Sequence, residues 1–139
     1  MSLFPIFATT SSGLHANRVW MDAVADNIAN MNTAKPFNEA AFQARYVQVA
    51  ARHGDGSDPV GIGGGVDVTG VSFGNAEGQL RYDPTNPLAN EQGLVRYPDI
   101  DLSDQMTQLI QAQRSYQLNL TVIDRARESY QQAIQIQAR

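Results

Sequence analysis

Residues 101–138 read DLSDQMTQLIQAQRSYQLNLTVIDRARESYQQAIQIQA. Mainly apolar side chains recur in this stretch at alternating steps of four and three residues, a spacing that places them on one face of an α-helix. That face consists of Leu102, Met106, Leu109, Gln113, Tyr116, Leu120, Ile123, Arg127, Tyr130 and Ile134. Pro98 closes the preceding loop, and Asp101 and Asp104 bring acceptors and negative charge to the start of the helix. We therefore predict one long helix over residues 101–138.

A shorter helix is predicted near the N-terminus, over residues 9–31. Its apolar positions recur every seven residues, with a second set between them: Phe7, Leu14, Met21 and Ile28, then Val24 and Met31, with Asn17 as a polar interruption. We expect the hydroxyls of residues 9–12 to satisfy the first amides of this helix. Asn30 and Asn32 are expected to end it, because asparagine tolerates the left-handed conformation common at helix ends.

The two predicted helices differ in length. At 1.5 Å per residue the C-terminal helix is about 55 Å long and the N-terminal helix about 35 Å. If the two lie antiparallel, a third or more of the longer helix has no partner within the chain for its apolar face. We therefore expect that face to find its missing partner in another subunit.

The middle of the chain has the composition of strands and turns. Residues 33–98 hold ten of the eleven glycines and five of the six prolines. Short alternating runs predict half-buried strands at residues 46–49, 66–68, 71–73, 80–82 and 95–97. Gly70 shifts the alternation between two of them, which indicates a β-bulge, and residues 54–65 are expected to form a flexible loop. We expect a hairpin or small sheet packed on a helical stem.

These elements predict a mainly α fold, an antiparallel coiled coil of the N- and C-terminal helices with a small β-rich central insert. The first helix occupies residues 1–33, the insert residues 34–98, and the second helix residues 99–139. One helical domain is thus built from both termini.

Composition and motifs predict no catalytic residue, no cofactor, no metal site and no enzyme activity. Cysteine is absent, and ten Lys and Arg against fourteen Asp and Glu give a formal charge of −4, which does not favour a nucleic-acid partner. His15 and His53 lie on different elements, and the glycine run at 61–65 precedes a strand, unlike a phosphate-binding loop. No apolar run is long enough for membrane insertion, and the start does not read as a cleaved signal peptide.

Five segments carry a family resemblance: MSLF at 1–4, ADNIANMNT at 25–33, YDPTNPLAN at 82–90, GLVRYPDID at 93–101 and AQRSYQLN at 112–119. In this order they resemble the bacterial flagellar rod and hook axial proteins, and the last three point to a proximal rod member. The likeness covers essentially the whole chain. The chain departs from the family in Asp26, where asparagine is frequent, and in Trp20-Met21 inside the first helix.

The resemblance implies a structural subunit of the flagellar basal-body rod. Members assemble through their terminal helices into a tube that transmits torque and encloses the export channel. The implied partners are further copies of the chain, the rod proteins FlgB, FlgF and FlgG, the rod–ring adaptor FliE and the flagellar type III export apparatus. The implied location is the basal-body rod in the periplasmic space, reached without a cleaved signal peptide.

The same resemblance implies which residues contact neighbouring subunits. They are the helix-face residues and the asparagines near the end of the first helix: Leu14, Met21, Val24, Asn27, Ile28, Asn30, Asn32, Leu102, Met106, Leu109, Tyr116, Leu120, Ile123, Tyr130 and Ile134. For the asparagines, a role in ending the helix is an equal alternative to contact with a neighbouring subunit. The nine glutamines of the C-terminal helix fit an exposed polar face as well as an interface.

Two other classes of function remain as alternatives on the residues alone. A secreted helical-hairpin adaptor or effector that binds one protein partner fits the heptads, although a 65-residue insert separates the helices. A small hydrolase using Asp99, Asp101 and Asp104 is the other alternative, although capping of a helix explains aspartates at these positions.

Overall fold

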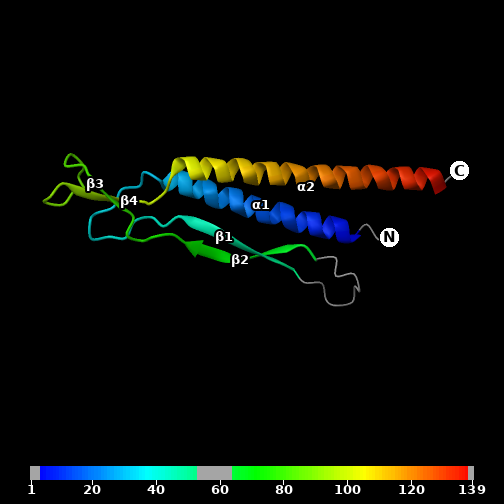
Figure 1. Cartoon of the computed structure of the whole chain (residues 1–139), viewed down its shortest axis with the longest axis horizontal. Helices are drawn as coiled ribbons and strands as arrows, with labels where there is room; N and C mark the ends of the chain where they lie inside the picture. Colours follow the sequence, from blue (N-terminus) through cyan, green and yellow to red (C-terminus); the bar gives the residue numbers. More distant parts are fainter. Residues whose placement is uncertain (1–3, 53–63, 138–139) are drawn as a thin grey trace.

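The chain folds into two long helices and two β-hairpins. The structure, a computed structural model, describes residues 4–52 and 64–137. It contains, in chain order, α1 (Phe4–Asn30), β1 (Arg45–Ala51), β2 (Val66–Phe73), β3 (Gln79–Tyr82), β4 (Leu94–Tyr97) and α2 (Leu102–Gln137) (Figure 1). The predicted mix of two terminal helices and a strand-rich insert is confirmed. His53 and residues 54–63 of the predicted loop lie outside the described residues.

The helices lie side by side and run antiparallel, because residues late in α1 contact residues early in α2. Near one end, the side chain of Asn27 donates a hydrogen bond of 3.0 Å to Gln105. Further along, a β-carbon at Gly13 would lie 2.9 Å from Nδ2 of Asn119, so the absence of a side chain at position 13 leaves room for the Asn119 amide.

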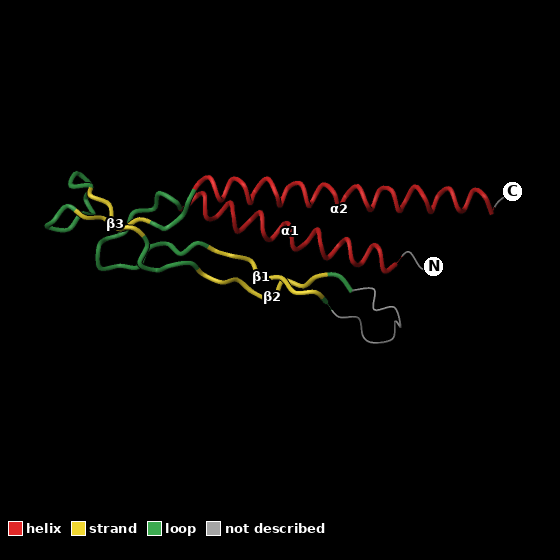
Figure 2. The backbone as a smooth tube through the Cα atoms, in the orientation of Figure 1, coloured by secondary structure: helices red, strands yellow, loops and turns green. Residues whose placement is uncertain are grey.

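The molecule has three layers, with α1 in the middle. One side of α1 packs on α2 and another on the hairpin β1–β2, as Figure 2 shows. The buried apolar side chains of these layers are mostly small; they are Ala16, Ala23, Val24 and Ala112. Small side chains let the elements approach closely, so the core is narrow and extends along the helices.

The hairpin β1–β2 is antiparallel, with Arg45 opposite Phe73 and Ala51 opposite Val66. Its register shifts between Gln48 and Val49, where β2 has one residue more than β1. That extra residue is Thr69, next to Gly70, so the predicted bulge is confirmed.

The hairpin β3–β4 lies beyond the joined ends of the two helices (Figure 1). Its Arg96 exchanges two backbone hydrogen bonds, of 2.8 and 3.0 Å, with Lys35 in the segment that follows α1. The Arg96 guanidinium also donates to the carbonyls of Phe37 and Glu77. Next to it, the side chain of Val95 is fully buried. These contacts join the segment that follows α1 to β4, the strand that precedes α2.

The helix starts confirm one sequence prediction and correct another. Oδ1 of Asp101 accepts hydrogen bonds from the backbone N–H groups of Ser103 (2.7 Å) and Asp104 (3.1 Å), so Asp101 caps α2 as predicted. The predicted caps of the first helix are wrong, because α1 already begins at Phe4. Thr10 therefore lies inside the helix and its hydroxyl donates to the carbonyl of Ile6 at 2.6 Å. Pro5 suits the first turn, where its missing N–H is not needed.

Candidate subunit interface

The predicted interface residues of α1 divide into buried and accessible ones. Val24 and Asn27 are each only 1% exposed and are covered by their own chain. Their side chains hold this chain together, and their contact with a neighbouring subunit stays a prediction. Leu14, Met21, Ile28 and Asn30 are half-buried, and Asn32, just after the helix, is exposed.

The predicted residues of α2 lie along the edge of its contact with α1. The half-buried members are Leu109, Tyr116 and Ile123. The exposed members are Leu102 (44%), Met106 (44%), Leu120 (41%), Tyr130 (52%) and Ile134 (48%). The centre of the contact is instead formed by Gln105 and Ala112, which are 3% and 0% exposed. Most of the predicted helix face therefore remains accessible in the single chain.

A groove of about 400 Å³ follows the line where α1 and α2 meet. Its lining includes three of the predicted interface residues, Met21, Leu109 and Tyr116. Arg18 and Asp22 supply opposite charges to the same lining. We call this feature the helix–helix groove. A mixed lining of this kind can receive the side of another helix, with apolar contact at its base and polar contact at its rim.

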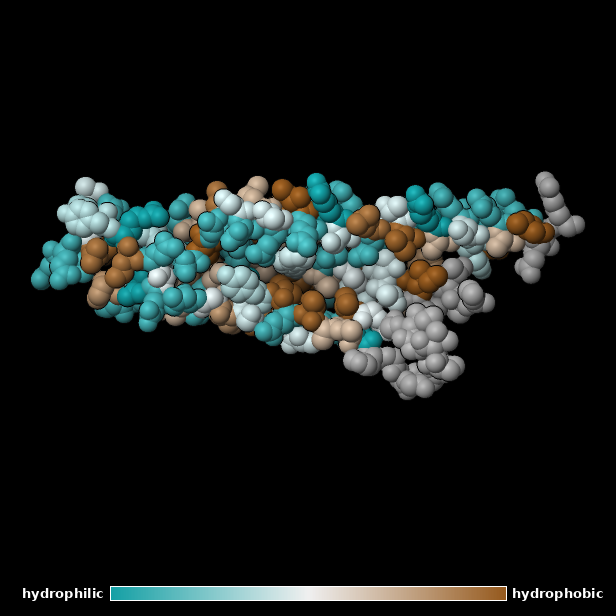
Figure 3. Space-filling view, viewed as in Figure 1, coloured by the Kyte–Doolittle hydropathy of each residue, from teal (hydrophilic) through white to brown (hydrophobic). Residues whose placement is uncertain are grey.

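The C-terminal end of α2 has no partner helix within the described chain. If the register set by Asn27 and Gln105 continues, Phe4 at the start of α1 lies level with Glu128. Beyond that level, Tyr130, Ile134 and Ile136 are 52%, 48% and 77% exposed. Figure 1 shows α2 projecting past α1, and Figure 3 shows hydrophobic side chains near its tip. The predicted length mismatch thus leaves a partly apolar helix end without cover.

A second groove, of about 390 Å³, lies between α1 and the hairpin β1–β2. Its lining is Gly13, Ala16, Asn17, Trp20, Val47, Val49 and Val66. Figure 3 shows hydrophobic atoms gathered over this hairpin, beside the helices. The sequence does not indicate this groove, because its valines come from strands whose position against α1 depends on the fold.

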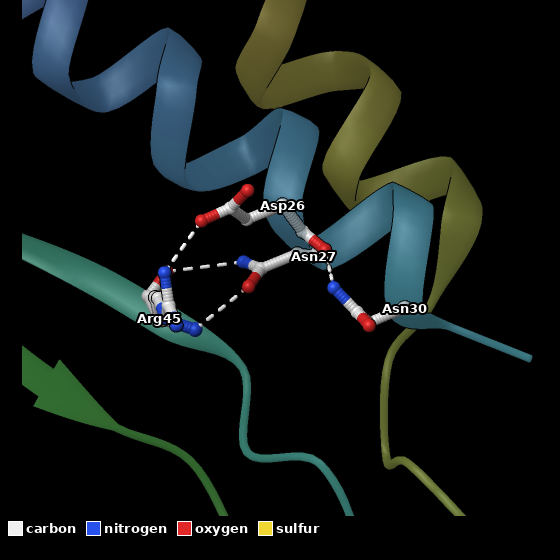
Figure 4. A network of polar contacts seen from close by, with 4 residues as sticks. All are labelled: Asp26, Asn27, Asn30 and Arg45. Atoms are coloured by element: carbon white, nitrogen blue, oxygen red, sulfur yellow. Dashed lines mark hydrogen bonds and ion pairs between the residues drawn. The ribbon is translucent and has the colours of Figure 1, made fainter. Parts of the chain in front are cut away.

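Asn27 is the centre of a polar contact among α1, α2 and β1, of which Figure 4 shows the part between α1 and β1. Its Nδ2 donates to the carbonyl of Arg45 and to Oε1 of Gln105, both at 3.0 Å, and its Oδ1 accepts from the N–H of Arg45 at 2.8 Å. The guanidinium of Arg45 also pairs with the carboxylate of Asp26, and Asn30 donates to the carbonyl of Asp26 at 2.9 Å. Both N–H donors of the buried Asn27 amide are therefore used, and its oxygen accepts one hydrogen bond.

The comparisons with known proteins match both helices of this arrangement. The family described as flagella basal body rod protein matches residues 7–35, and the family described as flagellar basal body rod FlgEFG protein C-terminal matches residues 91–136. The chain is 30% identical to the flagellar basal-body rod protein FlgC of Bacillus subtilis over 98% of this chain and 99% of that protein. It is 35% identical to FlgC of Yersinia enterocolitica, over 89% and 90%, and 32% identical to FlgC of Aquifex aeolicus, over 97% of each. The chain belongs to the FlgC family of flagellar basal-body rod proteins.

As a member of the FlgC family the chain is a structural subunit of the flagellar rod and not an enzyme. The two family models cover most of α1 and of α2 together with β4, whereas the hairpin β1–β2 lies between them. The alignments with the FlgC relatives of Bacillus subtilis and Aquifex aeolicus extend over nearly the whole chain and so include this hairpin.

Within residues 4–52 and 64–137, no group of three or more His, Cys, Asp or Glu side chains is placed to hold a metal ion, and no helix is long and apolar enough to cross a membrane. A hydrogen bond from Arg52 lowers the pKa of the Asp67 carboxyl, but this pair is exposed on the hairpin. Of the aspartates weighed for catalysis, Asp101 caps α2 and Asp99 accepts a hydrogen bond of 2.7 Å from Gln79.

Proposed function

We propose that this chain assembles with copies of itself into the proximal rod, a tube that encloses the export channel and transmits torque. The observation that carries the proposal is the uncovered end of α2, where Tyr130, Ile134 and Ile136 have no partner in the described chain. An exposed apolar helix end of this kind is typical of a surface that another subunit covers.

The contacts in the rod are proposed to be coiled-coil packing of α1 and α2 with helices of neighbouring subunits. The participating residues are Leu14, Met21, Ile28, Asn30, Asn32, Leu102, Met106, Leu109, Tyr116, Leu120, Ile123, Tyr130 and Ile134. A neighbouring helix lies in the helix–helix groove and another covers the end of α2. Burying one side chain of this size contributes about 1.5–3 kcal/mol, so several such contacts suffice for a stiff assembly.

The proposed partners extend to the rod proteins FlgB, FlgF and FlgG and the rod–ring adaptor FliE, with the type III apparatus exporting the chain. The proposed location is the periplasmic part of the basal body, reached without a cleaved signal peptide. In the proposed domain arrangement, residues 1–33 and 99–139 form one helical domain at the rod, and residues 34–98 pack outside it. The family matches at residues 7–35 and 91–136 support this division.

The proposal is tested with Ile134→Asp, a charge placed at the uncovered end of α2. The matched control is Gln132→Asp, which adds the same charge two residues away, on the opposite side of the helix. We expect Ile134→Asp cells to export the protein but to build no rod beyond it and not to swim, whereas Gln132→Asp cells swim. Normal swimming of the Ile134→Asp strain would contradict the proposed contact.

A second measurement separates a rod subunit from an adaptor that binds a single partner. The chain has no cysteine, so Tyr130→Cys introduces a single reactive thiol at the end of α2. A cross-linker used on purified basal bodies should join copies of the chain to one another and to the neighbouring rod proteins. Cross-links to a single protein outside the basal body would instead support the adaptor.

A further inference from the structure

The apolar pattern of the helix pair does not by itself determine its axial register. Leu14, Met21 and Ile28 recur every seven residues on α1, and Leu109, Tyr116, Ile123 and Tyr130 do so on α2. At the centre of the contact, Ala126 follows the close-approach position Asn119 at the same interval. A slip of α1 by one heptad, about 10.5 Å, would therefore place apolar side chains against apolar side chains again.

Such a slip toward the C-terminus of α2 would cover the helix end that is free in the observed register. Gly13 would then lie opposite Ala126, and the start of α1 would lie level with Gln135. Tyr130 would gain cover from α1, as Tyr116 and Ile123 have at the same heptad position, whereas residues 102–108 at the start of α2 would lose it. Apolar burial therefore differs little between the two registers, so another contact must select one of them.

The amides of Asn27 and Gln105 are the contact that changes most in the slipped register. In the observed register both side chains are buried, at 1% and 3% exposure, and they are joined by a 3.0 Å hydrogen bond. After the slip, Asn27 would face Ala112, which has no acceptor on its side chain. By contrast, Trp20, which now donates to Gln108, would face Ser115 and would find another acceptor. Only the Asn27 amide is thus left with an unpaired donor in a buried place.

The second half of the Asn27 contact fixes the hairpin to the same register. Its amide pairs with both the N–H and the carbonyl of Arg45, as a neighbouring strand would (Figure 4). Movement of Asn27 along α2 would therefore also detach the start of β1. The backbone pair of Lys35 and Arg96 adds to this restraint. A slip of one heptad would also require residues 31–34, which reach about 13 Å when fully extended, to straighten.

We propose that Asn27 and Gln105 form a register lock, which holds α1 one heptad short of the end of α2 and so keeps Tyr130 uncovered for a neighbouring subunit. The lock rests on the proposed function in one respect, namely that a neighbouring subunit covers the free end of α2. Buried polar pairs are known to select one register among several that apolar packing allows. Asn27 and Gln105 are positioning residues in this sense, and the surface they position is the end of α2.

The test reads the register directly in the full-length chain, without assembly. A β-carbon at position 13 would lie 3.6 Å from Cγ of Asn119, so Gly13→Cys with Asn119→Cys reports the observed register. Gly13→Cys with Ala126→Cys reports the slipped register. Each pair is oxidised in the otherwise unchanged chain and in the variant Asn27→Leu/Gln105→Leu. The matched control is Asn30→Leu/Gln111→Leu, which removes one Asn and one Gln amide outside the lock.

We expect the unchanged chain and the control to cross-link at 13–119 and scarcely at 13–126. In Asn27→Leu/Gln105→Leu the yield of the 13–126 cross-link should rise roughly tenfold, with the helix content by circular dichroism retained. If cross-linking stays confined to 13–119 in a folded lock variant, the register lock is overturned.

A milder variant keeps the test informative if the double variant does not fold. Gln105→Met preserves the length of the side chain and removes only the acceptor for Asn27. It should raise the 13–126 yield by a smaller factor, and no rise in the folded protein would again overturn the lock. This readout is independent of swimming. If the lock variant changes register as expected but the Ile134→Asp strain swims normally, only the proposed function is contradicted.

Discussion

The indole Nε1 of Trp20 on α1 donates a hydrogen bond of 3.3 Å to Oε1 of Gln108 on α2. Trp20 also lines the groove between α1 and the hairpin β1–β2, so its ring lies where all three layers meet. It is the only tryptophan of the chain. Its fluorescence therefore reports the packing of α1 on its neighbours, and it supplies the signal for the stability measurements below.

Replacing Gln108 by Leu should destabilise the monomer by removing the acceptor of this half-buried indole. We expect the free energy of unfolding in urea, followed by Trp20 fluorescence, to fall by about 0.5–1.5 kcal/mol. Gln111→Leu is the matched control, because Gln111 is exposed on the same helix, and it should change the value by less than about 0.5 kcal/mol. Equal effects of the two substitutions would show that the Trp20 contact contributes nothing.

Val24 and Val122 provide a comparison between the core and the surface. Val24 is 1% exposed within the helix pair, and Val122 on α2 is 47% exposed. Val24→Ala should lower the free energy of unfolding by about 1–3 kcal/mol, since it removes buried methyl groups and leaves a cavity. Val122→Ala should lower it by less than about 0.5 kcal/mol in the monomer. A loss at Val24 as small as that at Val122 would contradict its place in the core.

The fold could be predicted from sequence because its helices and strands follow simple periodicities. The heptad spacing of Leu109, Tyr116 and Ile123 predicts the long helix, and the interrupted alternation around Gly70 predicts the bulged hairpin. The predicted start of the first helix lies too far along the chain. The hydroxyls of residues 9–12 resemble caps, but α1 begins at Phe4, more than one turn earlier.

The centre of the helix contact could not be predicted from apolar periodicity. The helices approach at Gly13 and Ala112, where side chains are small, and the large apolar residues lie along the edges. Hydrophobicity identifies large side chains and gives little weight to small ones. The partners of Asn27 were also missed, because Arg45 and Gln105 are distant in sequence and meet only after the strands are placed.

The uncovered end of α2 should be the least protected part of that helix in a dilute monomer. Backbone amides of residues 129–137 lack tertiary cover, whereas residues 105–126 pack on α1. Hydrogen exchange followed by mass spectrometry should therefore show fast exchange in the first range and slow exchange in the second. The same end should become protected in purified basal bodies. Equal slow exchange along all of α2 in the monomer would mean that its end needs no partner.

The ion pair of Arg52 and Asp67 should give a pH-dependent contribution to stability at the end of the hairpin where β1 ends and β2 begins. The hydrogen bond and charge of Arg52 lower the pKa of Asp67 below its ordinary value. A lowered pKa in the folded state means that the stabilising contribution is present above the ordinary pKa and is lost as pH falls through the lowered one. In an NMR titration, Arg52→Gln should raise the pKa of Asp67 toward the ordinary range. Arg81→Gln on β3, the control, should leave the pKa of Asp67 unchanged, and a null result for Arg52→Gln would rule out the pair in solution.

Asp101 distinguishes a structural role from a catalytic one for the aspartates before α2. Its Oδ1 accepts hydrogen bonds from the N–H groups of Ser103 and Asp104, so Asp101→Ala should lower the free energy of unfolding by about 1 kcal/mol. Asp101→Asn retains a side-chain acceptor and should cost only a fraction of this, with normal swimming. A catalytic carboxylate would behave differently, because Asn removes the charge that acid–base chemistry requires. Urea titration of both variants, together with swimming assays, separates the two roles: loss of function in a stable Asp101→Asn variant would mean that Asp101 does more than cap the helix.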